Sequence, residues 1–179
     1  MPSATDDLPV YDSLAAEETA SPVSVGIGEL AVSNDGRQLV SNGFGSCVGV
    51  ALVDEAASVV GLSHSMLPTR PDHPEPERVE TPARYADAGV EALVDGVVAA
   101  GANPNRLVAK LVGGSRMFSF GGTEGTIGDR NLEAARDALD TASVPVVGTD
   151  VGGSVGRSVV LDAAGDLVVR RAVGSDLTL

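Results

Sequence analysis

The sequence predicts an α+β fold in which a mixed or antiparallel sheet system is covered by two helices. Short apolar runs typical of strands outnumber the two segments that have helical periodicity. Turn-forming residues join several of these runs over hairpin-length connections, which favours this class over a doubly wound parallel sheet. The chain has 179 residues, of which 43% are hydrophobic, and this length suits one domain with a substantial core.

The N-terminal segment is expected to stay outside the domain. Residues 1–22 mix acidic, hydroxyl, alanine and proline residues without a sustained apolar period, so they bury too little surface to offset the entropy lost on ordering. We therefore expect an acidic, disordered tail over 1–22 and a single domain over 23–179. The domain begins with a glycine-containing strand over 23–31, a turn at 34–36 and a short strand over 38–41.

A β-hairpin is predicted in the next part of the chain. The glycine-rich segment 43–46 makes a tight bend into an apolar strand over 47–53. Residues 54–57 turn the chain, and a second buried strand over 58–66 returns beside the first, with His64 near its end. The outer ends of the two strands are therefore expected to lie together.

A proline-rich loop separates this hairpin from the first helix. Five prolines between residues 67 and 82 disfavour both helix and central strand, so this segment is expected to be an exposed loop. Thr81-Pro82 is a typical helix start, and Gly101 is expected to end the helix. The apolar face of this helix is formed by Val90, Leu93, Val94, Val97 and Val98.

The second helix and the remaining strands follow. A strand is predicted over 107–112, then a glycine-rich connection over 113–128 and a helix over 130–142. Three further strands are predicted over 144–149, 157–161 and 167–173.

The charge balance excludes some classes of function. Acidic residues outnumber basic ones 25 to 12, and a net charge of −13 argues against binding to nucleic acid phosphates. The aliphatic runs are far shorter than the roughly 20 residues that cross a bilayer, so no membrane insertion is expected. The first basic residue is Arg37, which follows an acidic opening segment, so a secretory signal is not recognised and a cytoplasmic protein is expected.

Residue usage also indicates the environment of the protein. All but one of the 12 basic residues are arginines, Lys110 being the exception, and aromatic residues make up only 3% of the chain. With the excess of acids, this usage is typical of a halophilic protein, although an acidic protein from a GC-rich genome has the same composition. Cys47 is the single cysteine, which excludes an intrachain disulfide and a cysteine-based zinc site.

Cys47 and His64 are the candidate catalytic pair. Cys47 follows a glycine-rich bend, where exposed backbone amides suit a nucleophile, and a thiol needs a nearby base in order to attack. His64 is the plausible base, and Ser41 or Asn42 is close enough in sequence to orient its imidazole. The alternative is that Cys47 is a small core residue and His64 a satisfied buried polar group.

Other candidate sites carry weaker signals. His73 lies among prolines and is expected to be an exposed loop residue. The glycine bend joins strand to strand, without a helix N-terminus or a lysine, which argues against a phosphate site. Because no metal-ligand spacing is recognisable, neither a metal nor a cofactor is predicted. The glycine pairs 113–114 and 152–153 are either active-site walls or turns.

Several segments together resemble one family, the CheD chemoreceptor glutamine deamidases. The resemblance runs in order from about residue 23 to residue 170, so it is far more specific than one cysteine and one histidine. The segments that carry it are SNGFGSCVGV at 41–50, HSMLP at 64–68, KLVGGSRMF at 110–118, IGDRN at 127–131, VPV at 144–146 and DVGGSVGR at 150–157.

The resemblance implies hydrolysis of glutamine side-chain amides on methyl-accepting chemotaxis receptors, giving glutamate. By similarity, Cys47 is the nucleophile that forms a thioester, and His64 is the general base. Ser41 stands where the family commonly has threonine, and its hydroxyl is expected to orient His64. The resemblance also implies a mixed β-sandwich flanked by helices, similar to cytotoxic necrotizing factor-type cysteine deamidases, and the phosphatase CheC as a partner.

Two other functions remain open at this point. A non-catalytic adaptor with the same fold would bind receptors or CheC without chemistry. A cysteine amidase or transglutaminase that acts on another acceptor is the third interpretation, and transglutamination leaves an amine adduct instead of a carboxylate. The reactivity of Cys47 and the identity of the product distinguish these functions.

Overall fold

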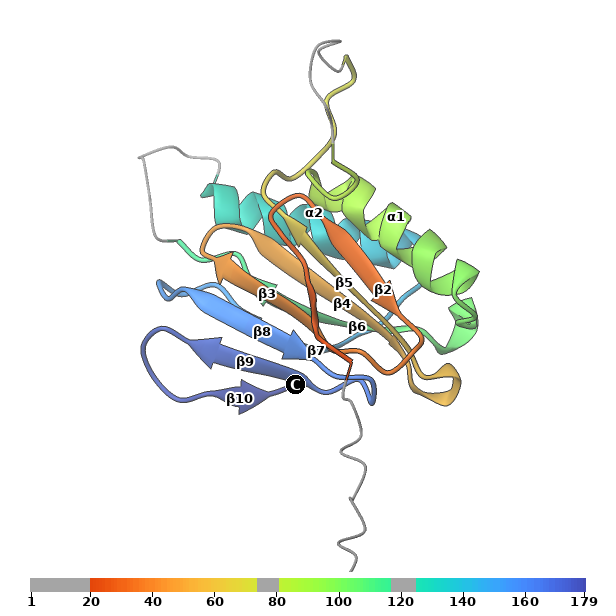
Figure 1. Cartoon of the computed structure of the whole chain (residues 1–179). Coiled ribbons are helices and arrows are strands. Elements are labelled where there is room, and N and C mark those ends of the chain that lie inside the picture. Colours follow the sequence, from red (N-terminus) through yellow and green to blue (C-terminus); the bar gives the residue numbers. More distant parts are fainter. Residues whose placement is uncertain (1–19, 74–80, 117–124) are drawn as a thin grey trace, which may run out of the picture.

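The computed structural model describes residues 20–73, 81–116 and 125–179 (Figure 1). Within these residues, two five-stranded sheets lie face to face. The first sheet contains, in spatial order, β1 (Val23–Ser24), β3 (Leu39–Phe44), β8 (Arg157–Leu161), β9 (Leu167–Arg171) and β10 (Leu177–Thr178). The second contains β2 (Leu30–Ser33), β5 (Val59–Ser65), β4 (Val48–Asp54), β6 (Val108–Gly113) and β7 (Val146–Val151).

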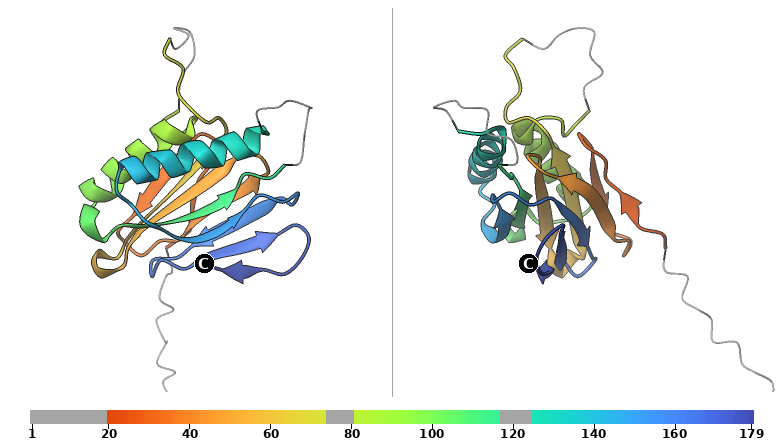
Figure 2. Two further views of the ribbon diagram at one scale, coloured as in Figure 1. Left: turned by 180° about the vertical axis from the view of Figure 1, so that it is seen from behind. Right: turned by 90° about the vertical axis from the view of Figure 1, so that its left-hand side faces the viewer.

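Two helices cover the outer face of the second sheet. Figure 2 shows α1 (Ala86–Ala99) and α2 (Ile127–Thr141) side by side on that face. Both sheets are mixed, since β1 runs parallel to β3 and β6 runs parallel to β7, whereas the other pairs of neighbours are antiparallel. The predicted α+β class, with a mixed β-sandwich and flanking helices, is confirmed.

The interior of the sandwich is one apolar core between the two sheets. Alternate residues of each strand point into it, because successive side chains of a strand face opposite sides. Burial of a valine, leucine or phenylalanine side chain in this core stabilises the fold by about 2 kcal/mol. The core is formed by Leu39, Phe44, Ala51, Val53, Val60, Leu62, Val112, Val159, Leu161, Leu167 and Val169, with Val25 at one edge.

A second core lies between the helices and the outer face of the second sheet. In α1, Val90, Leu93 and Val97 are buried as the periodicity predicts, whereas Val98 is 39% exposed. Gly61 in β5 brings α1 close, because a Cβ atom there would lie 2.7 Å from a methyl group of Val97. The absence of a side chain at this position therefore sets the distance between the helix and the sheet.

The second helix begins earlier than predicted. Thr126 caps it, with its side-chain oxygen accepting from the backbone N–H of Asp129 while the Asp129 carboxylate accepts from the N–H of Thr126. This capping box starts the helix at Ile127 instead of residue 130, because it satisfies two N–H groups that otherwise have no partner.

The single strand predicted over 23–31 is wrong. β1 pairs with β3 in the first sheet, whereas β2 pairs with β5 in the second, so the chain crosses from one sheet to the other between them. Gly28 has a φ of +80°, and the Glu29 carboxylate accepts from the N–H of Gly26 at 2.9 Å. These residues form a tight turn that interrupts the apolar run.

The predicted helix start at Thr81-Pro82 is also wrong, because the first helix begins at Ala86. The backbone before it is held in other hydrogen bonds. Ala83 N–H donates to the Gly28 carbonyl, and the Arg84 carbonyl accepts from the N–H groups at positions 66 and 67. Tertiary contacts therefore hold this segment in a turn, closed by the hydrogen bond from the Arg84 N–H to the Thr81 carbonyl, and the helix begins only after Tyr85.

The other predicted elements are found with small shifts at their ends. The hairpin of β4 and β5 is confirmed, with η1 (Glu55–Ala57) at its turn. The short strand predicted over 38–41 continues to Phe44, and β10 was not predicted. The tail over 1–19 and parts of the predicted connections, 74–80 and 117–124, lie outside the described residues, so the boundary of the domain at residue 23 stays a prediction.

Candidate active site

The β4–β5 hairpin brings Cys47 and His64 to the same face of one sheet. His64 pairs with Gly49 across the two strands, and Cys47 lies two residues before Gly49. Because side chains alternate along a strand, Cys47 and His64 both face the sandwich interior as diagonal neighbours. His64 is fully buried, whereas Cys47 is partly buried against the sandwich core.

The backbone of His64 is fixed by the turn between β1 and β2. Its N–H donates to the Glu29 carbonyl at 3.0 Å, and its carbonyl accepts from the N–H of Gly28 at 2.7 Å. The imidazole stacks on the ring of Phe44, with 4.0 Å between the centroids and 22° between the planes. Gly49 permits this stacking, because a Cβ atom at that position would lie 2.7 Å from Cε1 of Phe44.

Ser41, on β3 of the opposite sheet, orients the imidazole. Its Oγ lies 2.6 Å from the Val25 carbonyl oxygen and 2.9 Å from Nδ1 of His64. A carbonyl oxygen only accepts, so the serine hydroxyl donates its single proton to Val25 and accepts from Nδ1–H. This assigns the proton of neutral His64 to Nδ1 and leaves a lone pair on Nε2. Asn42, the other predicted candidate, is exposed.

Nε2 of His64 is buried and has no hydrogen-bond partner in the described part of the chain. Burial lowers the pKa of His64 to about 4, because the charged imidazolium is poorly solvated there. Burial also raises the pKa of the Cys47 thiol, although its own backbone N–H acts in the opposite direction. Both groups are therefore neutral near pH 7, which suits a base that accepts the thiol proton only during the attack.

The glycine pair at 113–114 holds the loop that carries Cys47. The N–H of Gly114 donates to the Cys47 carbonyl at 2.8 Å, and the N–H of Ser115 donates to the Gly45 carbonyl at 2.8 Å. Gly113 has a φ of +90°, a conformation that favours glycine. Of the two interpretations of this pair, the site-forming one is therefore supported, since the pair directly contacts the segment that carries Cys47.

An ion-pair network around the buried carboxylate of Asp150 supports that glycine pair. Arg157 donates to the Ser115 hydroxyl at 2.9 Å and to the Asp150 carboxylate at 2.9 Å. Arg171 donates to the same carboxylate at 2.6 Å, and the two guanidinium groups hold the pKa of Asp150 below its ordinary value. The network joins β7 of one sheet to β8 and β9 of the other.

Asn131 on α2 is a site residue that residue-by-residue reasoning missed. Its Nδ2 donates to the Ser46 carbonyl at 2.9 Å and to the Met66 carbonyl at 3.2 Å. The residue was noted only as part of the segment IGDRN that resembles the family. No local pattern connects it with Cys47, because the two are brought together by the packing of α2 on β4.

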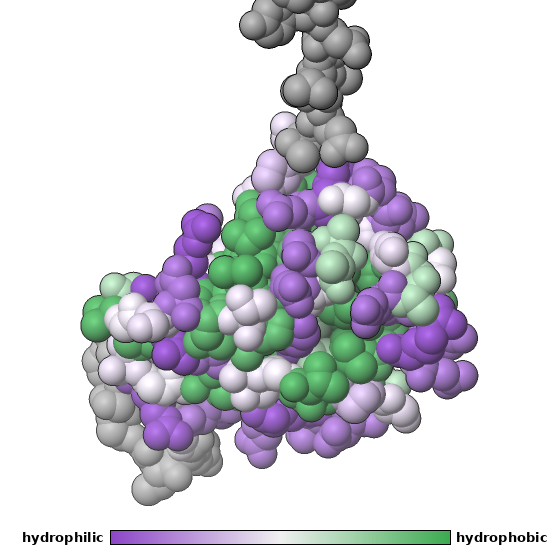
Figure 3. All heavy atoms as spheres, turned by 90° about the horizontal axis from the view of Figure 1, so that it is seen from below, coloured by the Kyte–Doolittle hydropathy of each residue, from purple (hydrophilic) through white to green (hydrophobic). Residues whose placement is uncertain are grey.

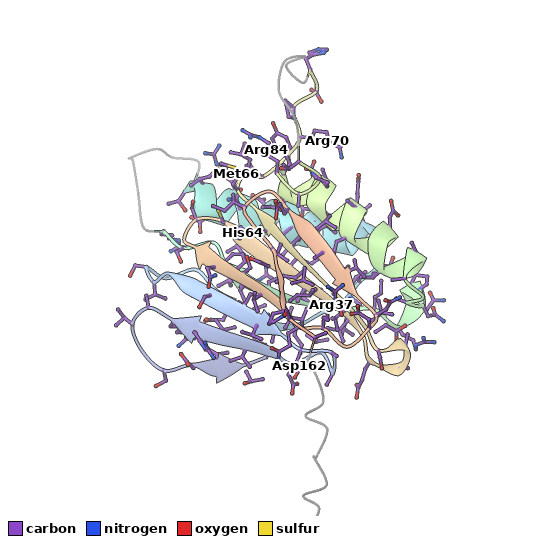
Figure 4. The ribbon with its side chains drawn as sticks, in the orientation of Figure 1. Arg37, His64, Met66, Arg70, Arg84 and Asp162 are labelled. Carbon is purple, nitrogen blue, oxygen red and sulfur yellow. The ribbon has the colours of Figure 1, made fainter. Side chains whose placement is uncertain are left out.

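The site lies at one end of the sandwich. In Figure 4, His64, Met66, Arg84 and Arg70 lie toward the end where the loop after β5 leaves the domain, and Met66 is 37% exposed. Figure 3 views the opposite end, where hydrophilic and hydrophobic residues are intermixed. His73 is exposed in its loop, as predicted.

Clusters of metal ligands and membrane-spanning helices are two further features that bear on function. In residues 20–73, 81–116 and 125–179, groups of three or more histidine, cysteine or acidic side chains placed to hold a metal ion are absent. Within the same ranges, none of the helices is long and apolar enough to cross a bilayer.

Solved structures give a weak likeness. The YfiH protein of Bacillus licheniformis has a TM-score of 0.44 and 17% identity, over 68% of this chain and 49% of that one. A likeness at this level carries no functional inference. The expected similarity to cytotoxic necrotizing factor-type deamidases stays a prediction.

Sequence comparisons give a much closer relationship. Proteins named probable chemoreceptor glutamine deamidase CheD are 39% identical in Haloarcula marismortui and 42% identical in Geobacillus kaustophilus. The first match covers 95% of this chain and 99% of that relative, and the second covers 86% and 94%. The family model described as CheD chemotactic sensory transduction matches residues 66–171. On this similarity along most of its length, the chain belongs to the CheD family.

Proposed function

We propose that the protein is a cysteine-dependent protein-glutamine deamidase that acts on methyl-accepting chemotaxis receptors. The names of its relatives, probable chemoreceptor glutamine deamidases, support the reaction and the class of substrate. The observation that carries the proposal is the hydrogen bond from Nδ1–H of His64 to Ser41, at 2.9 Å. It leaves the Nε2 lone pair available on the face of the hairpin that also carries Cys47.

In the proposed reaction, the sulfur of Cys47 bonds to the carbonyl carbon of the glutamine side chain. Nε2 of His64 accepts the thiol proton, and the electron pair of the carbonyl moves to its oxygen. When that pair returns, the carbon–nitrogen bond breaks, and the leaving amine takes the proton from His64 and departs as ammonia. Water then attacks the thioester with the help of His64, which gives glutamate and restores the thiol.

The neutral resting pair determines how this reaction begins. A thiolate–imidazolium pair would place two charges in a site that disfavours both, since burial lowers the pKa of His64 and raises that of Cys47. The proton therefore moves as the sulfur attacks, and backbone N–H groups near Cys47 stabilise the charge that develops on the substrate oxygen.

Mass spectrometry of a receptor fragment tests the proposal. A glutamine-bearing receptor cytoplasmic fragment is incubated in high salt with the wild type, Cys47→Ala, His64→Gln and His73→Gln. We expect glutamine to become glutamate with the wild type and with His73→Gln, the matched control at an exposed histidine. Conversion is expected to fall at least about a thousand-fold in the other two variants, because nucleophile and base act as a unit.

The same experiment distinguishes the other functions. If the folded wild type converts no glutamine of a cognate receptor, the non-catalytic adaptor is the better proposal. If amine adducts replace glutamate, the protein is a transglutaminase. The CheC phosphatase as a partner and the cytoplasm as location remain proposals from the family resemblance, and a binding assay with purified CheC tests the first of them.

A further inference from the structure

Asn131 joins the two segments that carry the candidate nucleophile and base. Its side-chain nitrogen donates to the carbonyl of Ser46, directly before Cys47, and to the carbonyl of Met66, two residues after His64. The residue is fully buried at the sheet-facing side of α2. One side chain therefore connects the loop before β4 to the end of β5.

The orientation of this amide is fixed by its partners. Both partners are carbonyl oxygens, which only accept, so Nδ2 must face them. Oδ1 is buried, and no donor within the described residues reaches it. A buried acceptor without a donor is costly, so the fold retains this side chain despite a penalty that an apolar residue would avoid. A role in the site explains why such a residue is there.

The Ser46–Cys47 peptide is aligned by this contact. The peptides of the described chain are trans, so the C=O and the N–H of this peptide point in opposite directions. Since Asn131 on α2 holds the Ser46 carbonyl, the Cys47 N–H points away from that contact. In the described part of the chain, no oxygen accepts a hydrogen bond from this N–H.

Two further observations agree with a donor placed beside the sulfur. The Cys47 N–H lowers the pKa of its own thiol, although burial, the larger effect, raises it. The carbonyls of Gly45 and Cys47 are held separately, by the N–H groups of Ser115 and Gly114. Asn131 is therefore the residue that specifically holds the remaining peptide of the bend, the one that contains the Cys47 N–H.

We propose that Asn131 is a positioning residue that aims the backbone N–H of Cys47 at the oxygen of the substrate amide. This inference rests on the proposed deamidase function and adds a residue to it. As sulfur attacks, charge develops on that oxygen, and a donor already pointing at it stabilises the transition state more than the bound substrate. Without Asn131, the carbonyl of this peptide loses its hydrogen bond, and the orientation of the donor is less strictly fixed.

The test separates this role from a structural one by comparing two reactions of Cys47. Deamidation develops charge on a carbonyl oxygen, whereas alkylation by iodoacetamide displaces iodide at a saturated carbon and does not need an oxyanion donor. For Asn131→Ala we expect the kcat of receptor deamidation to fall about ten- to a hundred-fold, with KM unchanged within about three-fold. The alkylation rate of Cys47 is expected to change by less than about three-fold.

Two more variants show whether a loss of activity in Asn131→Ala comes from the lost amide contacts or from a destabilised helix. Thr126→Ala removes the cap of the same helix without touching the amide contacts, and it is expected to keep the wild-type kcat. Asn131→Asp has the same size, and only its protonated form has a donor for one of the carbonyls. We expect its kcat to lie between those of wild type and Asn131→Ala, with the ratio to wild type rising as the pH falls.

The outcomes are distinct. An unchanged kcat in Asn131→Ala overturns the inference, and so does a parallel loss of deamidation and alkylation, which would show a structural role only. In both cases wild-type deamidation leaves the proposed function standing. If the folded wild type does not deamidate a cognate receptor, the proposed function fails, and this inference fails with it.

Discussion

At the scale of single residues, burial and one hydroxyl group determine the protonation of His64. The ring stacks on Phe44 and is fully buried, so the neutral form is favoured. Ser41 then selects the tautomer, because its own proton is used on the Val25 carbonyl. Threonine would supply the same acceptor with a more restricted rotamer, so serine retains the hydrogen bond and loses only some rigidity.

The buried histidine predicts how stability depends on pH. The pKa of His64 is about 4 in the folded protein, against an ordinary value of 6.5. Between these values the unfolded chain binds a proton that the folded protein excludes, so the free energy of unfolding falls as the pH falls from 6.5 to 4. The full effect is about 3 kcal/mol, at 1.36 kcal/mol for each pKa unit.

Denaturant unfolding at pH 7 and at pH 4 measures this effect. Protonation of carboxylates also lowers the free energy of unfolding over this pH range. The relevant quantity is therefore the difference between the losses of the wild type and of His64→Gln. We expect the variant to lose about 2 to 3 kcal/mol less than the wild type on acidification. His73→Gln, at the exposed histidine, is expected to follow the wild type. Equal losses in wild type and His64→Gln would contradict the assignment of a depressed pKa.

At the scale of elements, the β4–β5 hairpin is fixed at its turn as well as at the end that carries Cys47 and His64. Asp54, fully buried at the end of β4, accepts from the N–H of Asn103 at 2.7 Å and from Arg106 at 2.8 and 3.0 Å. These residues belong to η2 (Pro104–Arg106) and its cap, between α1 and β6. The contacts lower the pKa of Asp54 to about 2, with the hydrogen bonds from Arg106 as the largest cause.

This contact predicts a loss of stability without a loss of chemistry. Asp54→Asn removes the charge that two backbone segments and one guanidinium group solvate, and we expect it to lower the free energy of unfolding by about 1 to 3 kcal/mol. Deamidation by the folded variant is expected to stay within about two-fold of wild type, because the whole length of β4 separates Asp54 from Cys47.

The control for this prediction is a carboxylate in an exposed ion pair. Asp35 pairs with Arg37 at 2.9 Å, and both side chains are largely exposed to solvent. Exposed pairs contribute little to stability, so Asp35→Asn is expected to lower the free energy of unfolding much less than Asp54→Asn does. Equal losses of the free energy of unfolding in the two variants would contradict the claim that the buried contacts of Asp54 stabilise the fold more than an exposed ion pair does.

At the scale of the whole molecule, the sequence predicted local pairing better than it predicted sheet membership. The β4–β5 hairpin was predicted because both strands and their turn are adjacent in sequence. The split of 23–31 into two strands of different sheets was missed, since apolar periodicity contains no information about which sheet a strand joins. The helix start moved to Ala86 for a similar reason, because distant backbone groups hold the residues before it.

In the candidate site, too, the sequence predicted local features better than contacts between distant elements. Cys47, His64 and Ser41 were identified from the sequence, and the structure brings Ser41 and His64 together. Asn131 lies 85 residues after Ser46, and its contact exists only because α2 packs on the outer face of the second sheet. A residue that contacts a site from a distant element forms no recognisable motif with the other site residues. Such a residue is therefore found only from the structure.

The net charge of −13 leads to a prediction for the molecule as a whole. Carboxylates that repel one another are screened more strongly as salt rises, since the Debye length falls from about 10 Å at 0.1 M to about 3 Å at 1 M. If the composition reflects salt adaptation, the free energy of unfolding increases between 0.1 and 2 M KCl. Denaturant unfolding at both concentrations measures the increase.

A variant of α2 identifies the cause of this increase. Glu133, Asp137 and Asp140 are exposed on this helix, which also carries Arg130 and Arg136 at spacings of three and four residues from some of them. Replacing the three acids by Gln, Asn and Asn removes three negative charges, so we expect the free energy of unfolding to rise less between 0.1 and 2 M KCl than it does in the wild type. An equal rise in the two proteins would show that these carboxylates do not cause the salt dependence. A smaller rise in the variant would show that repulsion among acidic groups lowers the stability of the wild type in dilute buffer.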